Sequence, residues 1–184
     1  MLKFDKVSFR YPGQSENAIT DISFEIKKGE FVLLCGESGC GKTTLLRHTK
    51  KNQIPTGHGC GKMYFEGKDI EMLDDRECAS FIGYVGQSPD GQIVTDRVWH
   101  ELAFGLESLG CGRKEMRRRI AEMSEYLGIS GWYEKKTDEL SGGQKQILNL
   151  ASVMVMHPKL LILDEPTSQL DPVSSDRFLQ NIVK

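Results

Sequence analysis

Residues 31 to 46 read FVLLCGESGCGKTTLL and place glycines, a lysine and threonines at the spacing G-x-x-x-x-G-K-[ST]. Glycine permits backbone angles that other residues resist, so backbone N–H groups can turn inward around phosphate oxygens. The helix predicted to begin at Lys42 adds its own N–H donors and partial positive charge. We predict that Lys42 reaches the β- and γ-phosphates of a nucleotide and that the Thr43 hydroxyl binds Mg²⁺. The predicted phosphate loop comprises Gly36, Glu37, Ser38, Gly39, Cys40, Gly41, Lys42, Thr43 and Thr44.

A glycine-rich turn without any ligand is the alternative interpretation of this stretch. It is disfavoured because the apolar run before the loop, the loop itself and the helix after it follow one another in register. The run over residues 31–35 has the length and composition of a buried parallel strand.

A second group of residues suited to chemistry is the acidic pair Asp164 and Glu165. The pair follows the apolar run Leu160–Leu163, which predicts a buried strand. Ligands of α/β sheets bind at the carboxyl ends of such strands. Asp164 suits a role beside Mg²⁺, and Glu165 suits the positioning of an attacking water. An acidic pair that only caps a helix is the alternative, and the upstream phosphate loop disfavours it.

Two further segments present polar groups at the ends of predicted elements. Gln87 follows an apolar strand predicted over residues 81–85. Residues 140–146 read LSGGQKQ, in which Ser141 and the two glycines form a helix-start signal with exposed backbone donors.

The pattern of elements predicts an α/β fold in three segments. Residues 1–91 carry alternating strands at 2–9 and 22–26, the phosphate loop, a short strand at 62–65 and a short helix at 74–80. Residues 92–139 form a helical insertion, with helices at 95–109 and 113–127 whose arginine run, 117–119, lies on a solvated face. Residues 140–184 hold the LSGGQ helix and the strand that ends at Asp164.

Composition narrows the class of protein. The chain has 184 residues, of which 39% are hydrophobic, and this suits one soluble domain with a sizeable core. A formal net charge of −2 gives no electrostatic reason to expect a nucleic-acid partner. No apolar run approaches the ~18–20 residues of a membrane span, so we expect any membrane role to be carried by partner subunits. The N-terminus is not a secretory signal, and five cysteines without zinc-binding spacing fit reduced thiols in a cytosolic protein.

With these motifs in this order, the chain resembles an ATP-binding cassette (ABC) ATPase over nearly its whole length. The phosphate loop corresponds to the Walker A motif, residues 140–146 to the signature, residues 160–164 to the Walker B strand and residues 168–171 to the D-loop. The resemblance implies a P-loop NTPase (RecA-like) core with an antiparallel β subdomain at its N-terminus and an inserted helical subdomain. It also implies ATP and Mg²⁺ as cofactors.

The resemblance further implies roles for matching positions. Tyr11 would stack on adenine, and Gln87 would touch Mg²⁺ and sense a transmembrane partner. The implied catalytic residues are Glu165, Lys42 and Gln87. The implied Mg²⁺ ligands are Thr43, Gln87 and Asp164. The implied contacts to the nucleotide of a second cassette, in a head-to-tail dimer, are Ser141, Gly142, Gly143 and Gln144. Such a subunit would bind a transmembrane transporter subunit at the cytoplasmic face of the membrane.

A narrower resemblance lies in residues 87–92, QSPDGQ, and 101–110, ELAFGLESLG. Both are similar to the ATPase subunits of energy-coupling factor importers, which include cobalt- and vitamin-type systems. We therefore expect an ATPase that powers vitamin or metal-ion uptake. The alternatives are a soluble ABC-type ATPase acting on ribosomes or chromosomes, and a nucleotide-dependent regulator without turnover. The short segment 92–139 without sustained heptads disfavours the chromosomal type, and Glu165 argues against the regulator.

One family element is expected to be missing. ABC ATPases carry a switch histidine after the strand that follows the D-loop helix, and the sequence ends at Lys184 near that helix. His157 precedes the Walker B strand and is no substitute. We therefore expect a C-terminally truncated cassette that lacks the central strand and hydrolyses ATP poorly by itself. The backbone groups that this strand would pair are expected to stay unpaired.

Overall fold

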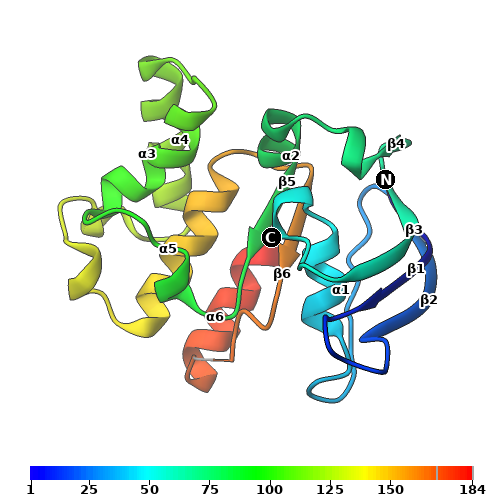
Figure 1. The fold of residues 1–184 in the computed structure, drawn as a ribbon. Helices are drawn as coiled ribbons and strands as arrows, with labels where there is room; N and C mark the ends of the chain where they lie inside the picture. Colours follow the sequence, from blue (N-terminus) through cyan, green and yellow to red (C-terminus); the bar gives the residue numbers. More distant parts are fainter. Residues whose placement is uncertain (169, 184) are drawn as a thin grey trace. The chain divides into compact units, whose positions relative to one another are not determined.

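The computed structural model describes residues 1–168 and 170–183. The chain forms two compact units, Met1–Ala79 and Ser80–Lys184, which are traced from blue to red in Figure 1. The first unit holds an antiparallel sheet, and the second holds a parallel strand pair with helices. The predicted α/β class and the N-terminal antiparallel β subdomain are confirmed. The division at residues 91 and 139 stays a prediction.

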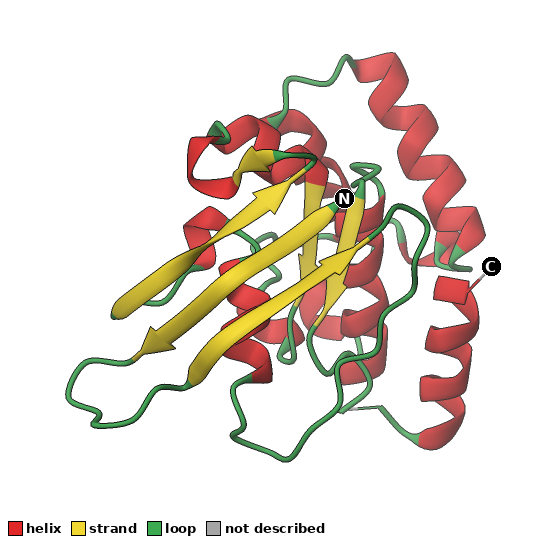
Figure 2. Ribbon diagram, turned by 90° about the vertical axis from the view of Figure 1, so that its right-hand side faces the viewer, coloured by secondary structure: helices red, strands yellow, loops and turns green. Residues whose placement is uncertain are grey.

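The sheet of the first unit has the strand order β2-β1-β3-β4. Its long strands are β1 (Leu2–Arg10), β2 (Ile19–Ile26) and β3 (His58–Phe65), and β4 (Lys68–Asp69) adds a short edge. Figure 2 shows the three long strands side by side, in yellow. The predicted strand at 62–65 extends back to His58, because residues 58–60 pair with the end of β1. Glycines suit this approach, since a Cβ at Gly57 would lie 2.4 Å from the Phe9 ring.

A bulge in β1 explains why its buried positions change parity. Leu2 and Phe4 are buried at even positions, whereas Val7 and Phe9 are buried at odd positions. The register with β2 and with β3 shifts between these pairs, where Lys6 has a φ of 52°. A bulge inserts one residue and turns the following side chains to the other face. Both halves of β1 therefore face the same core.

Short helices complete the first unit. They are α1 (Lys42–His48), η1 (Lys51–Gln53), η2 (Ile70–Met72) and most of α2 (Asp75–Phe81), whose last two residues belong to the second unit. α1 is anchored through its buried Leu45 and through His48, whose ring meets the Phe9 ring edge-on at 4.8 Å between centroids. This contact joins the helix after the phosphate loop to the sheet.

The strand predicted over residues 31–35 is wrong. The segment is assigned to no strand, and Phe31 and Leu33 are 71% and 77% exposed. A buried parallel strand requires hydrogen-bonding neighbours, because its backbone groups are otherwise unpaired. Within residues 1–168 and 170–183, the two sheets are β2-β1-β3-β4 and β5-β6, and neither includes this segment.

The second unit is built on β5 (Ile82–Val85) and β6 (Leu160–Leu163), which pair in parallel from Ile82↔Leu160 to Val85↔Leu163. Its longer helices are α3 (Val98–Ser108), α4 (Arg113–Tyr126), α5 (Gly142–Met154) and α6 (Pro172–Val183). Single 3₁₀ turns are η3 (Pro89–Gly91), η4 (Ser130–Trp132) and η5 (Thr137–Glu139). The predicted strand at 160–163 and the predicted helices 95–109 and 113–127 are confirmed to within a few residues.

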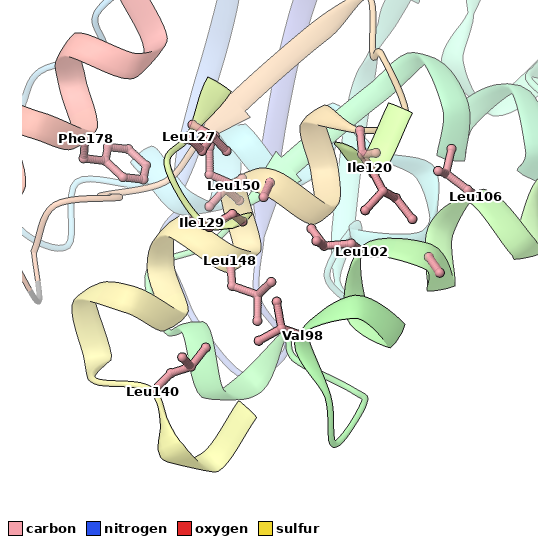
Figure 3. Packing of buried hydrophobic residues seen from close by; sticks show 14 residues of the cluster. Val98, Leu102, Leu106, Ile120, Leu127, Ile129, Leu140, Leu148, Leu150 and Phe178 are labelled. Carbon is pink, nitrogen blue, oxygen red and sulfur yellow. The ribbon is translucent and has the colours of Figure 1, made fainter. Parts of the chain in front are cut away.

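The core of the second unit is formed mainly by the apolar faces of its helices. Val98, Leu102 and Leu106 recur at helical spacing on α3, and all three are fully buried. Figure 3 shows side chains of this cluster, with Val98 and Leu102 near Leu148 of α5. The arginine run of α4 faces away from such packing, since Arg118 pairs with Glu115 and Glu122 on the surface. Among the described residues, no helix is both long and apolar enough to cross a membrane.

Candidate functional site

The phosphate loop curls around the ammonium group of Lys42. Nζ of Lys42 donates to the carbonyl oxygens of Gly36 at 2.9 Å and Glu37 at 2.8 Å. Gly41 caps α1 with a φ of 96°, and a Cβ there would lie 2.4 Å from the carbonyl oxygen of Ala18. Gly39 also has a positive φ, of 82°. Gly39 and Gly41 thus adopt backbone angles that favour glycine, and the lysine is directed at the loop.

Tyr11 lies beside the helix that follows the loop. Its hydroxyl is 3.0 Å from Oγ1 of Thr44, and its ring meets that of Phe9 edge-on at 5.0 Å between centroids. Thr44 itself is buried at 7% exposure. The structure therefore places the residue expected to stack on adenine next to the expected phosphate-binding residues. Its stacking role stays a prediction.

The two carboxylates predicted for the second unit, Asp164 and Glu165, follow the carboxyl end of β6, and Gln87 follows that of β5. Asp164 directly follows β6, is 4% exposed and accepts a hydrogen bond of 2.8 Å from the Tyr84 hydroxyl to Oδ2. Glu165 is exposed, and its φ of 47° is unusual for a residue other than glycine. Nε2 of Gln87 donates to Oε2 of Glu165 at 3.0 Å. The structure thus brings together three of the residues named from the sequence.

Four side chains that the sequence did not predict as site residues hold the loop after β5, three of them within the segments 87–92 and 140–146. Gln92 and Gln146 bind the backbone of Gly86, Asn149 binds the carbonyl oxygen of Pro89, and Lys145 pairs with Asp90. Tyr84 is a further missed residue. Its sequence signal is its place one residue before the end of the apolar run over residues 81–85.

The predicted signature forms the first turn of α5. Ser141 is the N-cap, since its Oγ accepts from Gln144 N at 3.3 Å while Gln144 Oε1 accepts from Ser141 N at 2.9 Å. Ser141 and Gly142 are exposed. A cap of this kind leaves other first-turn N–H groups directed outward from the helix end. In the D-loop, Gln169 lies outside the described residues.

The donor set suits magnesium better than a softer metal. Mg²⁺ takes oxygen ligands, keeps several waters and is commonly bound by one or two carboxylates together with substrate phosphates. The residues predicted from the sequence to bind Mg²⁺ all carry side-chain oxygens, Thr43 in the first unit and Gln87 and Asp164 in the second, and their metal-binding role stays a prediction. Among the described residues, no group of three or more His, Cys, Asp or Glu side chains could hold a metal ion alone.

These motifs and this fold define an ATP-binding cassette, and the chain belongs to the ABC transporter family. The sequence profile of the family described as ABC transporter matches residues 19–168. Among curated relatives, an ABC transporter ATP-binding protein of Bacillus thuringiensis is 47% identical over 177 residues, covering 96% of this chain and 32% of its own length. An ABC transporter ATP-binding protein of Streptomyces avermitilis is 41% identical over 182 residues, which cover 97% of this chain and 32% of its own length. The chain spans about a third of the length of these relatives.

Solved structures agree with this assignment. CbiO1 from Clostridium perfringens, described as part of the ABC transporter complex cbiONQ, superposes with a TM-score of 0.85 at 33% identity, covering 99% of this chain and 72% of CbiO1. The ATP-binding cassette MJ0796, a dimer in a post-hydrolysis state with ADP and phosphate, superposes with a TM-score of 0.81 at 27% identity. The superposition covers 99% of this chain and 81% of MJ0796. The fold is that of the P-loop ATPase domain of this family.

Proposed function

We propose that this chain binds and hydrolyses ATP to power transport across a membrane, in an energy-coupling factor type importer of a vitamin or metal ion. The observation that carries the proposal is that Gln87, Asp164 and Glu165 lie together at the carboxyl ends of β5 and β6. The same chain has a phosphate loop whose carbonyl oxygens bind Lys42. The importer type is supported by the resemblance of segments 87–92 and 101–110 and by the similarity to CbiO1.

Lys42 and Thr43 would bind the nucleotide. The Lys42 ammonium now donates to two loop carbonyls, and phosphate oxygens would take their place as stronger, charged acceptors. The loop N–H groups and the start of α1 add further donors. Tyr11, next to Thr44, would present its ring to adenine.

The second set of residues would act on the terminal phosphate. Thr43, Gln87 and Asp164 would hold Mg²⁺, which when bound offsets the negative charge of the phosphates. Glu165 would orient the attacking water and accept its proton, and it is exposed enough to do so. Gln87 already lies against Glu165, so one glutamine would adjoin both the metal and the water.

Dimerisation with a second cassette would complete the site. Ser141 to Gln144 would contact the γ-phosphate held by that partner through the exposed first turn of α5. MJ0796 is itself described as dimeric, and CbiO1 as part of a larger transporter complex. ATP binding would favour the closed head-to-tail pair, and hydrolysis would reopen it. A transmembrane subunit would hold the pair at the cytoplasmic face of the membrane.

Titration with a fluorescent ATP analogue in the presence of Mg²⁺ tests nucleotide binding directly. We expect saturable binding by the wild-type chain and a loss of at least tenfold in affinity for Lys42→Ala. Gly131→Ala serves as the matched control, because a Cβ at Gly131 meets nothing within 4 Å. Equal binding by wild type and Lys42→Ala would refute the proposal.

Turnover and dimerisation separate the proposed ATPase from the other classes. Glu165→Gln should abolish hydrolysis and accumulate an ATP-dependent dimer, seen by light scattering. A nucleotide-dependent regulator would bind ATP and show no effect of Glu165→Gln. Co-purification of the full-length protein with ribosomes or chromosomes, instead of membrane subunits, would support the soluble ATPase.

A further inference from the structure

The backbone of Gly86, the residue before Gln87, is held by two glutamine side chains. Its N–H donates to Oε1 of Gln92 at 2.7 Å, and its carbonyl oxygen accepts from Nε2 of Gln146 at 3.3 Å. Gln92 also donates through Nε2 to the carbonyl oxygen of Tyr84 at 3.2 Å. Gly86 is thereby tied both to β5 and to helix α5.

The far end of the same loop is tied to the same helix. Nδ2 of Asn149 donates to the carbonyl oxygen of Pro89 at 3.3 Å, and Nζ of Lys145 lies 2.6 Å from Oδ1 of Asp90. Gln146 and Asn149 stand three positions apart, on one face of α5, and each is only 2% exposed. Buried amides of this kind hold their partners in one geometry because water cannot replace them.

Gln87 contrasts with these supports. It is exposed, and its side chain reaches Glu165 over 3.0 Å. Gly86 directly precedes Gln87, so the orientation of the Gly86 peptide groups influences the position of the Gln87 side-chain amide. We propose that Gln146 and Gln92 are positioning residues, which fix Gly86 and thereby place the Gln87 amide against the Glu165 carboxylate. The catalytic relevance of this placement rests on the proposed function, whereas the placement itself does not.

The inference extends to the start of helix α5. The helix that carries Gln146 begins at the Ser141 cap, so the exposed signature turn and the Gln87 loop belong to one hydrogen-bonded assembly. A shift of the α5 axis would move the Gly86 carbonyl, and with it the Gln87 amide. Gln146 is therefore the residue through which the signature helix sets the geometry at Glu165.

Gln146 can be tested without unfolding the protein. Its Oε1 is buried and has no hydrogen-bond partner among the described residues. Methionine has a similar length and no polar atoms that need a partner, so Gln146→Met removes this orphan acceptor together with the donor to Gly86. Gln92→Met removes the second support at a partly exposed position, where packing constrains it less.

The test is the side-chain amide resonance of Gln87 in ¹H–¹⁵N NMR spectra of the whole chain, recorded without nucleotide. The resonance is assigned by its disappearance in Gln87→Leu. Glu165→Ala removes the acceptor and defines the shift of the released amide. We expect Gln146→Met and Gln92→Met each to move the Gln87 resonance by at least half of that shift. Ser152→Ala is the control, since its hydroxyl donates to the Asn149 carbonyl of its own helix.

Three results would overturn the proposal. The Gln87 resonance could stay unchanged in Glu165→Ala, or stay unchanged in both methionine variants, or move equally in Ser152→Ala. Where the chain turns over ATP, Gln146→Met should lower kcat several-fold in the wild-type background and have no further effect in a Gln87→Ala background. Absence of turnover in the full-length protein would refute the proposed ATPase, and the NMR measurement would still decide the role of Gln146.

Discussion

The Tyr84 hydroxyl donates a hydrogen bond of 2.8 Å to Oδ2 of Asp164. Tyr84 is paired with Ile162 in the β5–β6 ladder, and Asp164 lies two residues further along. Side chains two residues apart share a face of a strand, so the tyrosine and the carboxylate lie on the same side of the pair. Both are buried, at 6% and 4% exposure. Tyr84 therefore fixes the direction of the carboxylate proposed to hold Mg²⁺.

Tyr84→Phe should weaken Mg²⁺-dependent ATP binding and leave Mg²⁺-free binding unchanged. The variant keeps the ring and removes one hydrogen bond to a charged group, worth about 1.5 kcal/mol, or about tenfold in affinity. Titration with ATP in the presence of Mg²⁺ and in the presence of EDTA separates Mg²⁺-dependent from Mg²⁺-free binding. Tyr126→Phe, at a 43% exposed position on α4, is the control. An equal loss in Mg²⁺ and EDTA would show that Tyr84 supports the fold and not the metal site.

The residues of the site that could be predicted from the sequence carry local signals. Glycine spacing marks the phosphate loop, the apolar run marks the strand before Asp164, and Ser141 with Gln144 marks a helix start. Tyr84 and Gln146 carry no such signal, because their partners lie 80 and 60 positions away in the sequence. Contacts of this kind depend on which strands and helices become neighbours.

The same limit explains the error at residues 31–35. Apolar composition and length describe a segment that could be a buried strand, but only pairing with neighbours makes it one. The reverse error occurs just before the predicted strand at 62–65, which leaves out the glycine-containing residues 58–61. Pairing of Ser8 with Cys60 and of Arg10 with His58 makes this segment part of β3. In both places sheet membership, which is non-local, decides the outcome.

The phosphate loop offers a matched pair of glycines for a stability test. Gly39 and Gly41 both have positive φ, of 82° and 96°. A Cβ at Gly39 meets nothing within 4 Å, whereas one at Gly41 would lie 2.4 Å from the Ala18 carbonyl oxygen. We expect Gly39→Ala to lower the free energy of unfolding by about 1–2 kcal/mol through backbone strain alone.

Gly41→Ala should cost more, by a further 1–3 kcal/mol or so, because the backbone of Ala18 must also move. Chemical denaturation of both variants measures the difference. Equal losses would mean that the approach of the loop to Ala18 is looser than the structure shows.

His48 should make stability depend on pH. Burial lowers the pKa of His48, and the hydrogen bond with the Thr44 carbonyl, at 2.6 Å, opposes this only in part. The unfolded chain, with a histidine pKa of about 6.5, then binds a proton more readily than the folded chain. The stability that comes from neutral His48 is therefore complete above pH 6.5 and is lost as the pH falls through the lower folded pKa.

Denaturation curves from pH 7.5 to 5 measure this dependence. His48→Phe, which keeps an aromatic ring against Phe9, should reduce the slope of the free energy of unfolding against pH. His58→Gln, at an exposed position, is the control and should leave this slope in place. Identical slopes for wild type and His48→Phe would contradict the assignment.

A comparison of Leu33 with Leu102 tests whether residues 31–35 are exposed, as the structure shows, or buried in a strand. Leu33 is 77% exposed, and Leu102 of α3 is fully buried. We expect Leu33→Ala to change the free energy of unfolding by less than about 0.5 kcal/mol, as at other surface sites. Leu102→Ala should cost about 2–5 kcal/mol, because it leaves a cavity in the core of the second unit.

Leu102→Ala reports on the second unit, whereas Leu33 belongs to the first. Leu45→Ala, at a 6% exposed position in α1, is therefore the matched control within the first unit. Leu45→Ala should also cost about 2–5 kcal/mol. A loss above about 2 kcal/mol for Leu33→Ala would mean that residues 31–35 are buried, as the sequence pattern alone predicted.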